Sequence, residues 1–314
     1  MKKLVLVVLW VFMVCGVVFS QNWQQELEDA KNQMEEIMDT FTRVFPDVAT
    51  QQNIEPRAWI GYLIQQPYPE ITKRSGKVTK ELPHFTIGLL PVGFAFMKTD
   101  ELNRVGRTIN ETDIIPIPML PFPSISIDAR IGGIKTSGVN LPFDLGFSFF
   151  SLNLGSMLGD DADLGLQWTN WGLDARYLII KQNGAIPNVS ANVGFAHWSL
   201  DLDTDIFDGE LSTNTVYFGG QASYTLNFFI PYLGIKMMTG KNKGIITLTS
   251  DDPNAAALAP ELKSQTVGSD KTFFNMQFYG GFGLDWLVFQ TSIGASINVF
   301  TGTPGINFST RFSL

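Results

Sequence analysis

Gly305-Ile306-Asn307-Phe308-Ser309-Thr310-Arg311-Phe312-Ser313-Leu314 closes the chain, and this stretch decides the fold. Apolar side chains or Thr stand at every second position, and polar side chains stand between them. This period of two is typical of a β-strand with one apolar and one polar face. A bare terminal strand with aromatic side chains is an aggregation-prone edge in a soluble protein, so we expect this strand to pair with another.

The same alternation recurs from residue 85 onward and is clearest over 216–226, 273–284 and 287–298. A tilted strand that crosses a bilayer needs about 9–11 residues, which these segments supply. In a transmembrane barrel the last strand closes onto the first, with apolar side chains toward lipid and polar ones toward the lumen. The sequence therefore predicts an all-β fold: a transmembrane antiparallel up-and-down β-barrel of about ten strands, within a range of 8–12.

We expect the strands over 85–97, 114–131, 141–153, 164–181, 188–201, 214–227, 230–247, 272–284, 286–299 and 305–314. Proline cannot donate to a ladder, so Pro91 predicts a bulge or one-sided pairing in the first strand. In the second strand, prolines place the true start near Ser124; they are Pro116, Pro118, Pro121 and Pro123.

The connections between these strands alternate in length. The mostly long, polar ones are 98–113, 154–163, 202–213 and 248–271, and the mostly short ones are 132–140, 182–187, 228–229 and 285. Outer-membrane barrels have short periplasmic turns and longer extracellular loops. This alternation predicts an even strand number, with both chain termini in the periplasm.

The terminal stretch resembles the last strand of bacterial outer-membrane β-barrel proteins, which alternates in this way and commonly ends in Phe. Here the last residue is Leu314 and the nearest aromatic residue is Phe312. The resemblance covers roughly residues 85–314 and carries no catalytic or binding residues across. It implies a bacterial outer-membrane location, contact with outer-membrane lipid, and recognition of residues 305–314 by the barrel-assembly machinery.

The first 20 residues have the composition of a secretory signal peptide. Lys2 and Lys3 precede an apolar run, and small residues end at Ser20, so we expect cleavage there and export through the inner membrane. The rival is a lipoprotein signal acylated at Cys15, but Phe12-Met13-Val14 lacks the small residue expected before that cysteine. Cleavage after Ser20 leaves no cysteine, which excludes disulfides, thiolate catalysis and cysteine metal sites.

Residues 21–83 precede the barrel, which spans 84–314. Apolar residues at three- and four-residue steps predict an amphipathic helix over 23–48, ended by Pro46, and 49–83 is predicted to be an irregular connector. The helix either plugs the barrel or seals its periplasmic mouth; the alternative is that it lies against the periplasmic rim or pairs with a copy of itself. Loss of Lys2 and Lys3 changes the net charge from −8 to −10, which argues against nucleic acid as a partner.

Six charged residues are predicted to face the lumen, because charge on the lipid face costs about 2–4 kcal/mol near the midplane. Four of them stand in two similar motifs, Ile127-Asp128-Ala129-Arg130 and Leu173-Asp174-Ala175-Arg176, and the other two are Lys236 and Arg311. They form either a charged constriction that selects solutes or a neutralised salt-bridge network that fills a narrow barrel. The second interpretation is favoured, because barrels of about eight to ten strands are mostly filled by side chains.

Acidic loops offer a candidate calcium site. Alternate carboxylates can converge on Ca²⁺, which takes six to eight oxygen ligands. The candidate ligands are Asp201, Asp203, Asp205 and Asp208, with Asp160, Asp161 and Asp163 on the neighbouring hairpin. The spacing lacks the glycine and final glutamate of the twelve-residue calcium loop, so an ordinary solvated acidic loop is the favoured interpretation. No other cofactor is expected.

Enzyme activity is not expected. The chain has two histidines, His84 and His197, and neither stands in a recognisable His-Asp-Ser pattern. His197 is predicted to belong to an interfacial aromatic belt with Trp198, Trp168, Trp171 and Tyr177. No glycine-rich phosphate loop or zinc-ligand spacing occurs.

The sequence therefore favours an outer-membrane barrel that is a narrow passive conduit or a structural and surface-interaction protein. One alternative is a transporter for hydrophobic compounds, resembling the fatty-acid channel family, whose members carry an N-terminal hatch before a larger barrel. A further alternative is a soluble secreted β-sandwich or adhesin, in which one strand face packs inside the protein.

Overall fold

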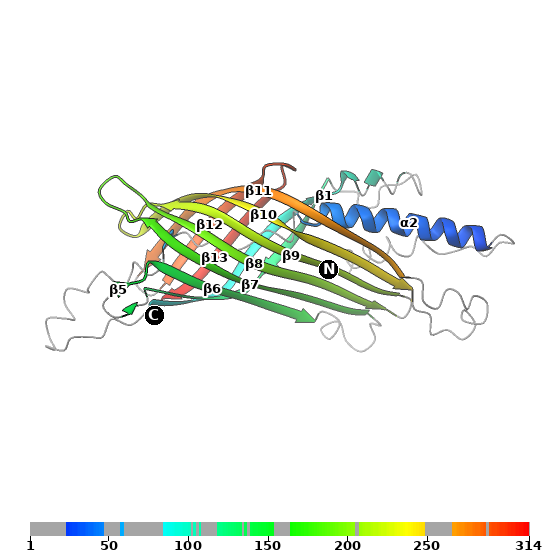
Figure 1. Cartoon of the computed structure of the whole chain (residues 1–314), viewed down its shortest axis with the longest axis horizontal. Coiled ribbons are helices and arrows are strands. Elements are labelled where there is room, and N and C mark those ends of the chain that lie inside the picture. Colours follow the sequence, from blue (N-terminus) through cyan, green and yellow to red (C-terminus); the bar gives the residue numbers. More distant parts are fainter. Residues whose placement is uncertain are drawn as a thin grey trace.

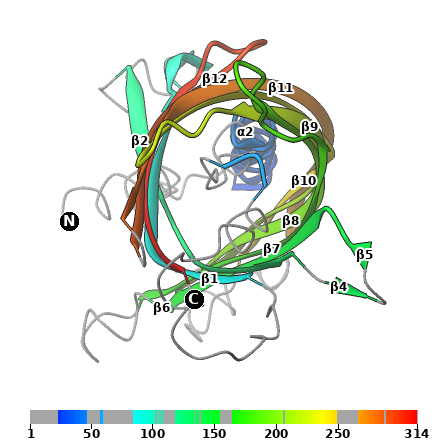
Figure 2. The same cartoon turned by 90° about the vertical axis from the view of Figure 1, so that its left-hand side faces the viewer.

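The structure, a computed structural model, describes residues 23–46, 57–59, 84–101, 103–104, 107, 118–133, 135–136, 139–153, 164–204, 207–248, 266–286 and 289–313. The predicted signal peptide and most of the predicted connector therefore lie outside the described residues. The described part contains one amphipathic helix and an antiparallel sheet that closes on itself (Figures 1 and 2).

The sheet is a barrel of ten strands, as the alternation predicted. Its strands follow chain order: β1 (His84–Lys98), β2 (Met119–Ile125) with β3 (Ile127–Gly132), β6 (Phe143–Asn153), β7 (Leu164–Ile180), β8 (Asn188–Thr204), β9 (Phe207–Ser223), β10 (Phe229–Leu248), β11 (Thr266–Trp286), β12 (Phe289–Asn298) and β13 (Pro304–Ser313). A small hairpin of β4 (Lys135–Thr136) and β5 (Val139–Asn140) lies in the connection from β3 to β6.

β2 and β3 form one strand of the wall, interrupted at Ser126, because both pair with β1. This strand begins at Met119, earlier than the predicted start near Ser124. Its prolines are tolerated because β2 pairs with β1 along its length, whereas among the described residues only β3 pairs with β6. Proline is accommodated where one side of a strand has no ladder partner.

The terminal strand closes the barrel, as predicted. β13 pairs with β12 on one side and with β1 on the other, from Thr86↔Ser313 to Ala95↔Gly305. The β1–β13 register shifts between Leu89 and Val92, which confirms the bulge predicted at Pro91. The terminal strand therefore leaves no open edge, and of the described wall it is β2 that pairs on one side only.

The two ends of the barrel differ. We call one end the loop end; there the chain connects β1 to β2, β6 to β7 and β10 to β11. The opposite turn end holds the connections from β7 to β8 and from β9 to β10, together with His84 and Ser313. The prediction of a long loop over 202–213 is wrong, because β8 and β9 continue as a paired hairpin as far as Asp203↔Asp208. The loop was predicted because the side chains there are polar. They indicate exposure to water, and the backbone still continues as a paired ladder.

The faces of the strands are reversed relative to a soluble protein. Large apolar side chains point outward in a zone called the apolar band, which includes Phe147, Phe149, Val193, Val216, Phe218, Leu233, Phe278, Ile293 and Phe308. Inward positions are buried and polar, including Ser190, Gln221, Asn275, Gln277, Gln290, Ser292, Asn298 and Ser309. The alternative of a soluble β-sandwich is therefore wrong, because its apolar face would be packed inside.

The helix α2 (Trp23–Val44) begins where predicted and ends just before Pro46. It lies at the loop end, with its C-terminal part inside the ring of strands (Figures 1 and 2). Both termini were predicted to lie in the periplasm; Ser313 is at the turn end and α2 is at the loop end, while the N-terminus itself lies outside the described residues. An even number of strands fixes the end of the barrel at which β1 begins. It does not fix the end at which the preceding helix α2 lies.

Candidate functional site

The six lumen charges predicted from sequence all lie on the inner wall of the barrel. Asp128 and Arg130 are on β3, Asp174 and Arg176 on β7, and the other two are Lys236 on β10 and Arg311 on β13. Five of the six form ion pairs between strands, and Lys236 lies instead against two aromatic rings. Within the two echoed motifs, Asp and Arg do not pair with each other; each binds a partner on another strand.

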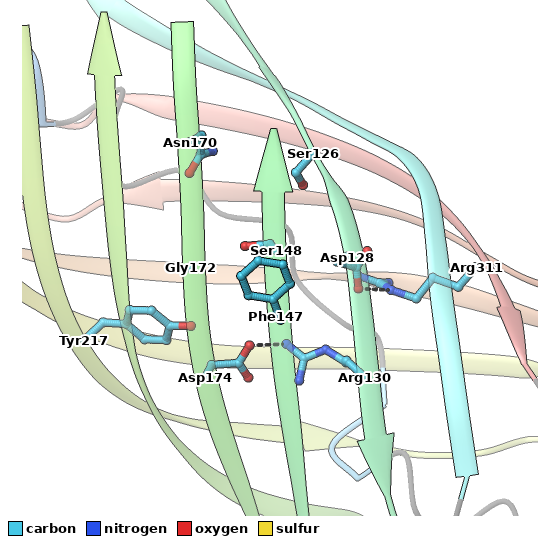
Figure 3. A pocket seen from close by; sticks show the side chains of 10 residues that line it. All are labelled: Ser126, Asp128, Arg130, Phe147, Ser148, Asn170, Gly172, Asp174, Tyr217 and Arg311. Carbon is cyan, nitrogen blue, oxygen red and sulfur yellow. Dashed lines mark hydrogen bonds and ion pairs between the residues drawn. The ribbon is translucent and has the colours of Figure 1, made fainter. Parts of the chain in front are cut away.

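The first ion pair joins β3 to β7 across the strand between them, β6, at the position of a glycine. Arg130 Nη2 lies 2.6 Å from Asp174 Oδ1 (Figure 3). Gly146 of β6 is the direct register partner of both residues, so it lies between them on the wall. A Cβ at Gly146 would collide with Asp174 Oδ1 and lie 2.8 Å from Arg130 Cζ. The missing side chain is what lets this ion pair lie flat against the wall.

The second pair repeats this arrangement on the other side of β3. Arg311 Nε lies 3.1 Å from Asp128 Oδ2 (Figure 3). Arg311 also donates to Ser309 Oγ. Gly88 of β1 is the register partner of both charged residues. The Arg311 and Asp128 side chains are 2% and 8% exposed, so both charges are removed from bulk water and satisfied mainly by each other.

The third pair involves a residue that sequence reasoning missed. Arg176 Nη2 lies 3.1 Å from Asp144 Oδ2 on the neighbouring strand β6, and the side chains are 3% and 0% exposed. Asp144 was detectable, because it occupies an inward position of the strand predicted over 141–153. A carboxylate with no exposed surface requires a cationic partner, and Arg176 supplies it.

Lys236 is held by aromatic rings. Its Nζ lies 5.0 Å from the ring centroid of Tyr217 and 5.7 Å from that of Tyr279, which is the range of cation–π contacts. Each ring covers a glycine on the adjacent strand, Tyr217 over Gly194 and Tyr279 over Gly234. Glycines at these inward positions give the rings room to lie along the wall and fill the lumen.

A second missed element is the short segment 57–59, which lies inside the barrel near the turn end. The Arg57 side chain forms an ion pair with Asp285, and its carbonyl accepts a hydrogen bond from Arg176. The backbone N–H of Ala58 donates to Ser223 Oγ at 2.8 Å. Arg57, Ala58 and Trp59 are all buried, so the connector contributes to the filling of the lumen.

Helix α2 fills the mouth at the loop end with apolar side chains. Phe45 packs against Trp198, with ring centroids 4.4 Å apart, and against the edge of Phe122. The same cluster includes Ala95, Met97 and Leu120 from the wall. Met38 forms a further cluster with Ile246 and Val267, and these residues lie closer to the loop end of the strands. The helix therefore enters the barrel with its C-terminal end first.

Polar contacts fix the rotation of α2. Asn242 Nδ2 donates to the carbonyl of Thr42 at 2.7 Å, and Thr42 Oγ1 donates to Ser269 Oγ at 2.9 Å. Lys271 Nζ lies 2.7 Å from Asp39 Oδ1. The hydrogen bond from Lys271 lowers the pKa of Asp39 below its usual value, so this contact is present at neutral pH. Both side chains are more than 40% exposed, so the ion pair itself contributes little stability.

Replacement of Gly146 by Ala is expected to destabilise the barrel by about 1–3 kcal/mol, because the new methyl group overpacks the Arg130–Asp174 pair. The measurement is urea unfolding of the protein folded in lipid vesicles, followed by Trp fluorescence. The control is Gly220→Ala, whose Cβ would meet nothing nearer than Ser190 O at 3.8 Å. Equal midpoints for the two variants would contradict the close packing at Gly146.

The acidic residues considered for calcium lie at the loop end. Asp201 faces Glu210 across the β8–β9 ladder, and Asp203 faces Asp208. Burial raises the pKa of Asp201, with a further contribution from Glu210, and burial with nearby Asp203 raises that of Asp208. Within the described residues, no cluster of three His, Cys, Asp or Glu side chains could hold a metal. Asp205 and the carboxylates of 160–163 lie outside the described residues, so the calcium site stays a prediction.

The predicted aromatic belt is only partly correct. His197 and Trp171 face outward, with ring centroids 5.9 Å apart, and His197 Nδ1 lies 2.9 Å from Asn214 Oδ1. Trp198 is instead 6% exposed and packs on Phe45, with Trp168 beside it in the lumen. Neighbouring residues of a strand face opposite sides, so His197 and Trp198 cannot share a belt. The absence of enzyme activity stays a prediction.

Among the described residues, no helix has both the length and the apolar composition that crossing a membrane requires.

No protein-family model matches the chain, and no curated protein matches it. Solved structures that it resembles include Ail, the attachment invasion locus protein of Yersinia pestis, at 9% identity and a TM-score of 0.30, covering 74% of this chain and 99% of Ail. The translocator domain of the autotransporter NalP from Neisseria meningitidis is similar at 7% identity and a TM-score of 0.35, covering 76% of this chain and 90% of that domain. The toluene transporter TodX of Pseudomonas putida is similar at 9% identity and a TM-score of 0.26, covering 73% of this chain and 67% of TodX.

Proposed function

We propose that this chain is an outer-membrane β-barrel whose lumen is closed in the described state, acting as a structural or surface-interaction barrel. The carrying observation is the filling of the lumen from end to end: α2 at the loop end, ion pairs in the middle, and Arg57–Trp59 near the turn end. The cavity between the ion pairs measures ≈ 40 Å³. On this measure one water molecule needs about 10–15 Å³, so the cavity has room for a few waters only.

The outer-membrane location is supported by the arrangement of the two strand faces. The apolar band is exposed around the barrel, while the lumen wall is polar and carries charged pairs. A closed barrel leaves no backbone edge unpaired in lipid, which is the requirement for a β-structure in a bilayer. In this proposal, outer-membrane lipid surrounds the apolar band, the barrel-assembly machinery reads residues 305–314, and the turn end faces the periplasm.

A conducting role requires removal of the segments that fill the lumen. The ion pairs have matched charges, so they present no single-sign ring of the kind that selects ions. A second candidate, transport of hydrophobic compounds, is favoured by one observation: the mouth around Phe45 is lined by Met97, Leu120, Phe122 and Trp198. Under that candidate, hexane or toluene added to the folded protein changes the fluorescence of Trp198, whereas the closed structural barrel predicts no change.

Single-channel recording in planar bilayers tests the closed lumen. Wild-type protein is expected to give no steady openings, whereas Arg57→Ala, which removes the ion pair to Asp285, is expected to give transient openings as residues 57–59 detach. The matched control is Lys243→Ala, an exposed residue of β10 that faces away from the lumen. Steady openings from correctly folded wild-type protein would contradict the proposal and make the barrel a passive conduit.

A further inference from the structure

The N-terminal segment contacts the barrel at two different heights of the lumen. Phe45 lies at the loop end with Trp198, seven positions from the end of β8 at Thr204 when counted inclusively. Ala58 lies near the turn end, where its N–H bonds Ser223, the last residue of β9. Both residues are buried inside the barrel. The chain between them therefore joins two heights of the same lumen.

The direction of α2 follows from its own contacts. Met38 packs with Ile246 and Val267, near the loop-end limits of β10 and β11, while Phe45 lies deeper against Ala95 and Trp198. Residues earlier in the helix, such as Asn32, Glu35 and Glu36, are exposed. Figure 1 shows the N-terminal part of α2 extending beyond the loop ends of the strands. The helix thus points out of the barrel with its N-terminal end leading.

The barrel itself starts at the opposite end. His84 pairs with Gly132 at the turn end, and Ser313 of the last strand pairs with Thr86 there. The first described residues and the start of β1 consequently lie on opposite sides of the apolar band. The described residues before β1 therefore contact the lumen near both of its ends, with α2 at the end opposite to the start of β1.

We propose that the N-terminal part of α2 is displayed on the outer surface of the cell, carried there through the lumen of the barrel that the same chain forms. This rests on the proposed function, in which the turn end faces the periplasm. Display separates the two ends of the described chain: the N-terminal end of α2 lies outside the cell, while Ser313 stays in the periplasm. The ion pair of Arg57 with Asp285 and the contacts of Phe45 hold the segment across the membrane.

Cysteine labelling of cells that express the full chain tests this proposal. Single cysteines are placed at Asn32 on α2, at Lys243 near the loop end and at Ala185 in the turn between β7 and β8; all three positions are exposed. A membrane-impermeant maleimide is added to intact cells and, in parallel, to cells with a permeabilised outer membrane. The wild-type chain gives the blank for Cys15, the cysteine of the native sequence.

Asn32→Cys and Lys243→Cys are expected to react fully in intact cells, and Ala185→Cys only after permeabilisation. If Lys243→Cys reacts in intact cells but Asn32→Cys needs permeabilisation, display is wrong while the proposed function stands. If Ala185→Cys reacts in intact cells and Lys243→Cys does not, the orientation in the proposed function is wrong, and display fails with it. Trypsin added to intact wild-type cells gives a check without substitutions, because display predicts cleavage after Lys31 and a periplasmic helix predicts none.

Discussion

Replacement of Arg176 by Met is expected to lower the free energy of unfolding by about 3–5 kcal/mol, because it leaves a buried carboxylate without its cation. Asp144 has no exposed side-chain surface, and Arg176 Nη2 lies 3.1 Å from its Oδ2. The substitution also removes the hydrogen bond that Arg176 donates to the carbonyl of Arg57. Urea unfolding in lipid vesicles, followed by Trp fluorescence, measures the change.

Two further variants make this prediction specific. In Arg176→Met with Asp144→Leu both charges are gone, so most of the lost stability is expected to return. Lys181→Met removes a positive charge at an exposed position of the turn end and is expected to change stability by less than about 0.5 kcal/mol. If Arg176→Met unfolds at the wild-type urea concentration, Asp144 reaches water by another route and the lumen is more open than described here.

Replacement of Phe218 by Arg is expected to cost about 2–4 kcal/mol of folding free energy in a bilayer, the cost of a cation near the midplane of the lipid face. Phe218 is 52% exposed on the outer face of β9, with Val216 before it in the apolar band. The measurement is the fraction of protein that becomes heat-modifiable after refolding into vesicles, together with the urea midpoint.

Asn214→Arg provides the matched control, because Asn214 is on the same face of β9 but lies beyond the apolar band, beside His197. It is expected to fold like wild type, since the cost of a cation falls to about 0–1 kcal/mol near the interface. Equal losses in the two variants would mean that the outer face does not contact lipid at the level of Phe218.

The barrel was predictable because the alternation of apolar and polar side chains along a strand can be seen in the local sequence. Alternation over 305–314 and its repetition upstream specify which face of each strand is apolar, and the closure of β13 onto β1 follows from the need to pair both edges. The same alternation indicated that all six predicted charges face the lumen. It also places Asp144 on the polar face of its strand, but Asp144 was overlooked because it stands alone and not in a repeated motif.

Which charges pair was not predictable. Arg130 reaches Asp174 across β6 and Arg311 reaches Asp128 across β1, so each contact depends on the register of two successive ladders. Gly146 and Gly88 permit these contacts, but glycines are scattered through most of these strands, and nothing local distinguishes these two.

The position of the N-terminal segment was not predictable either. Helical periodicity shows which face of α2 is apolar and leaves its partner open. Arg57 stands among prolines and polar residues, and its partner Asp285 is 228 positions away in the sequence. A contact between residues so far apart in the sequence leaves no local sequence pattern, and the chain must close a long loop to form it. Only the folded barrel brings the two residues together.

The position of residues 57–59 inside the barrel is tested most directly by a cross-link between Ala58→Cys and Ser223→Cys. In the structure the N–H of Ala58 lies 2.8 Å from Ser223 Oγ, whereas Ser296, the control partner, is on the inner wall near the other end of β12. Under mild oxidation of the folded full-length protein, the 58–223 pair is expected to form a disulfide in most molecules, seen as a linked peptide pair by mass spectrometry, and the 58–296 pair none. Two free thiols at 58 and 223 in correctly folded protein would contradict the filled lumen.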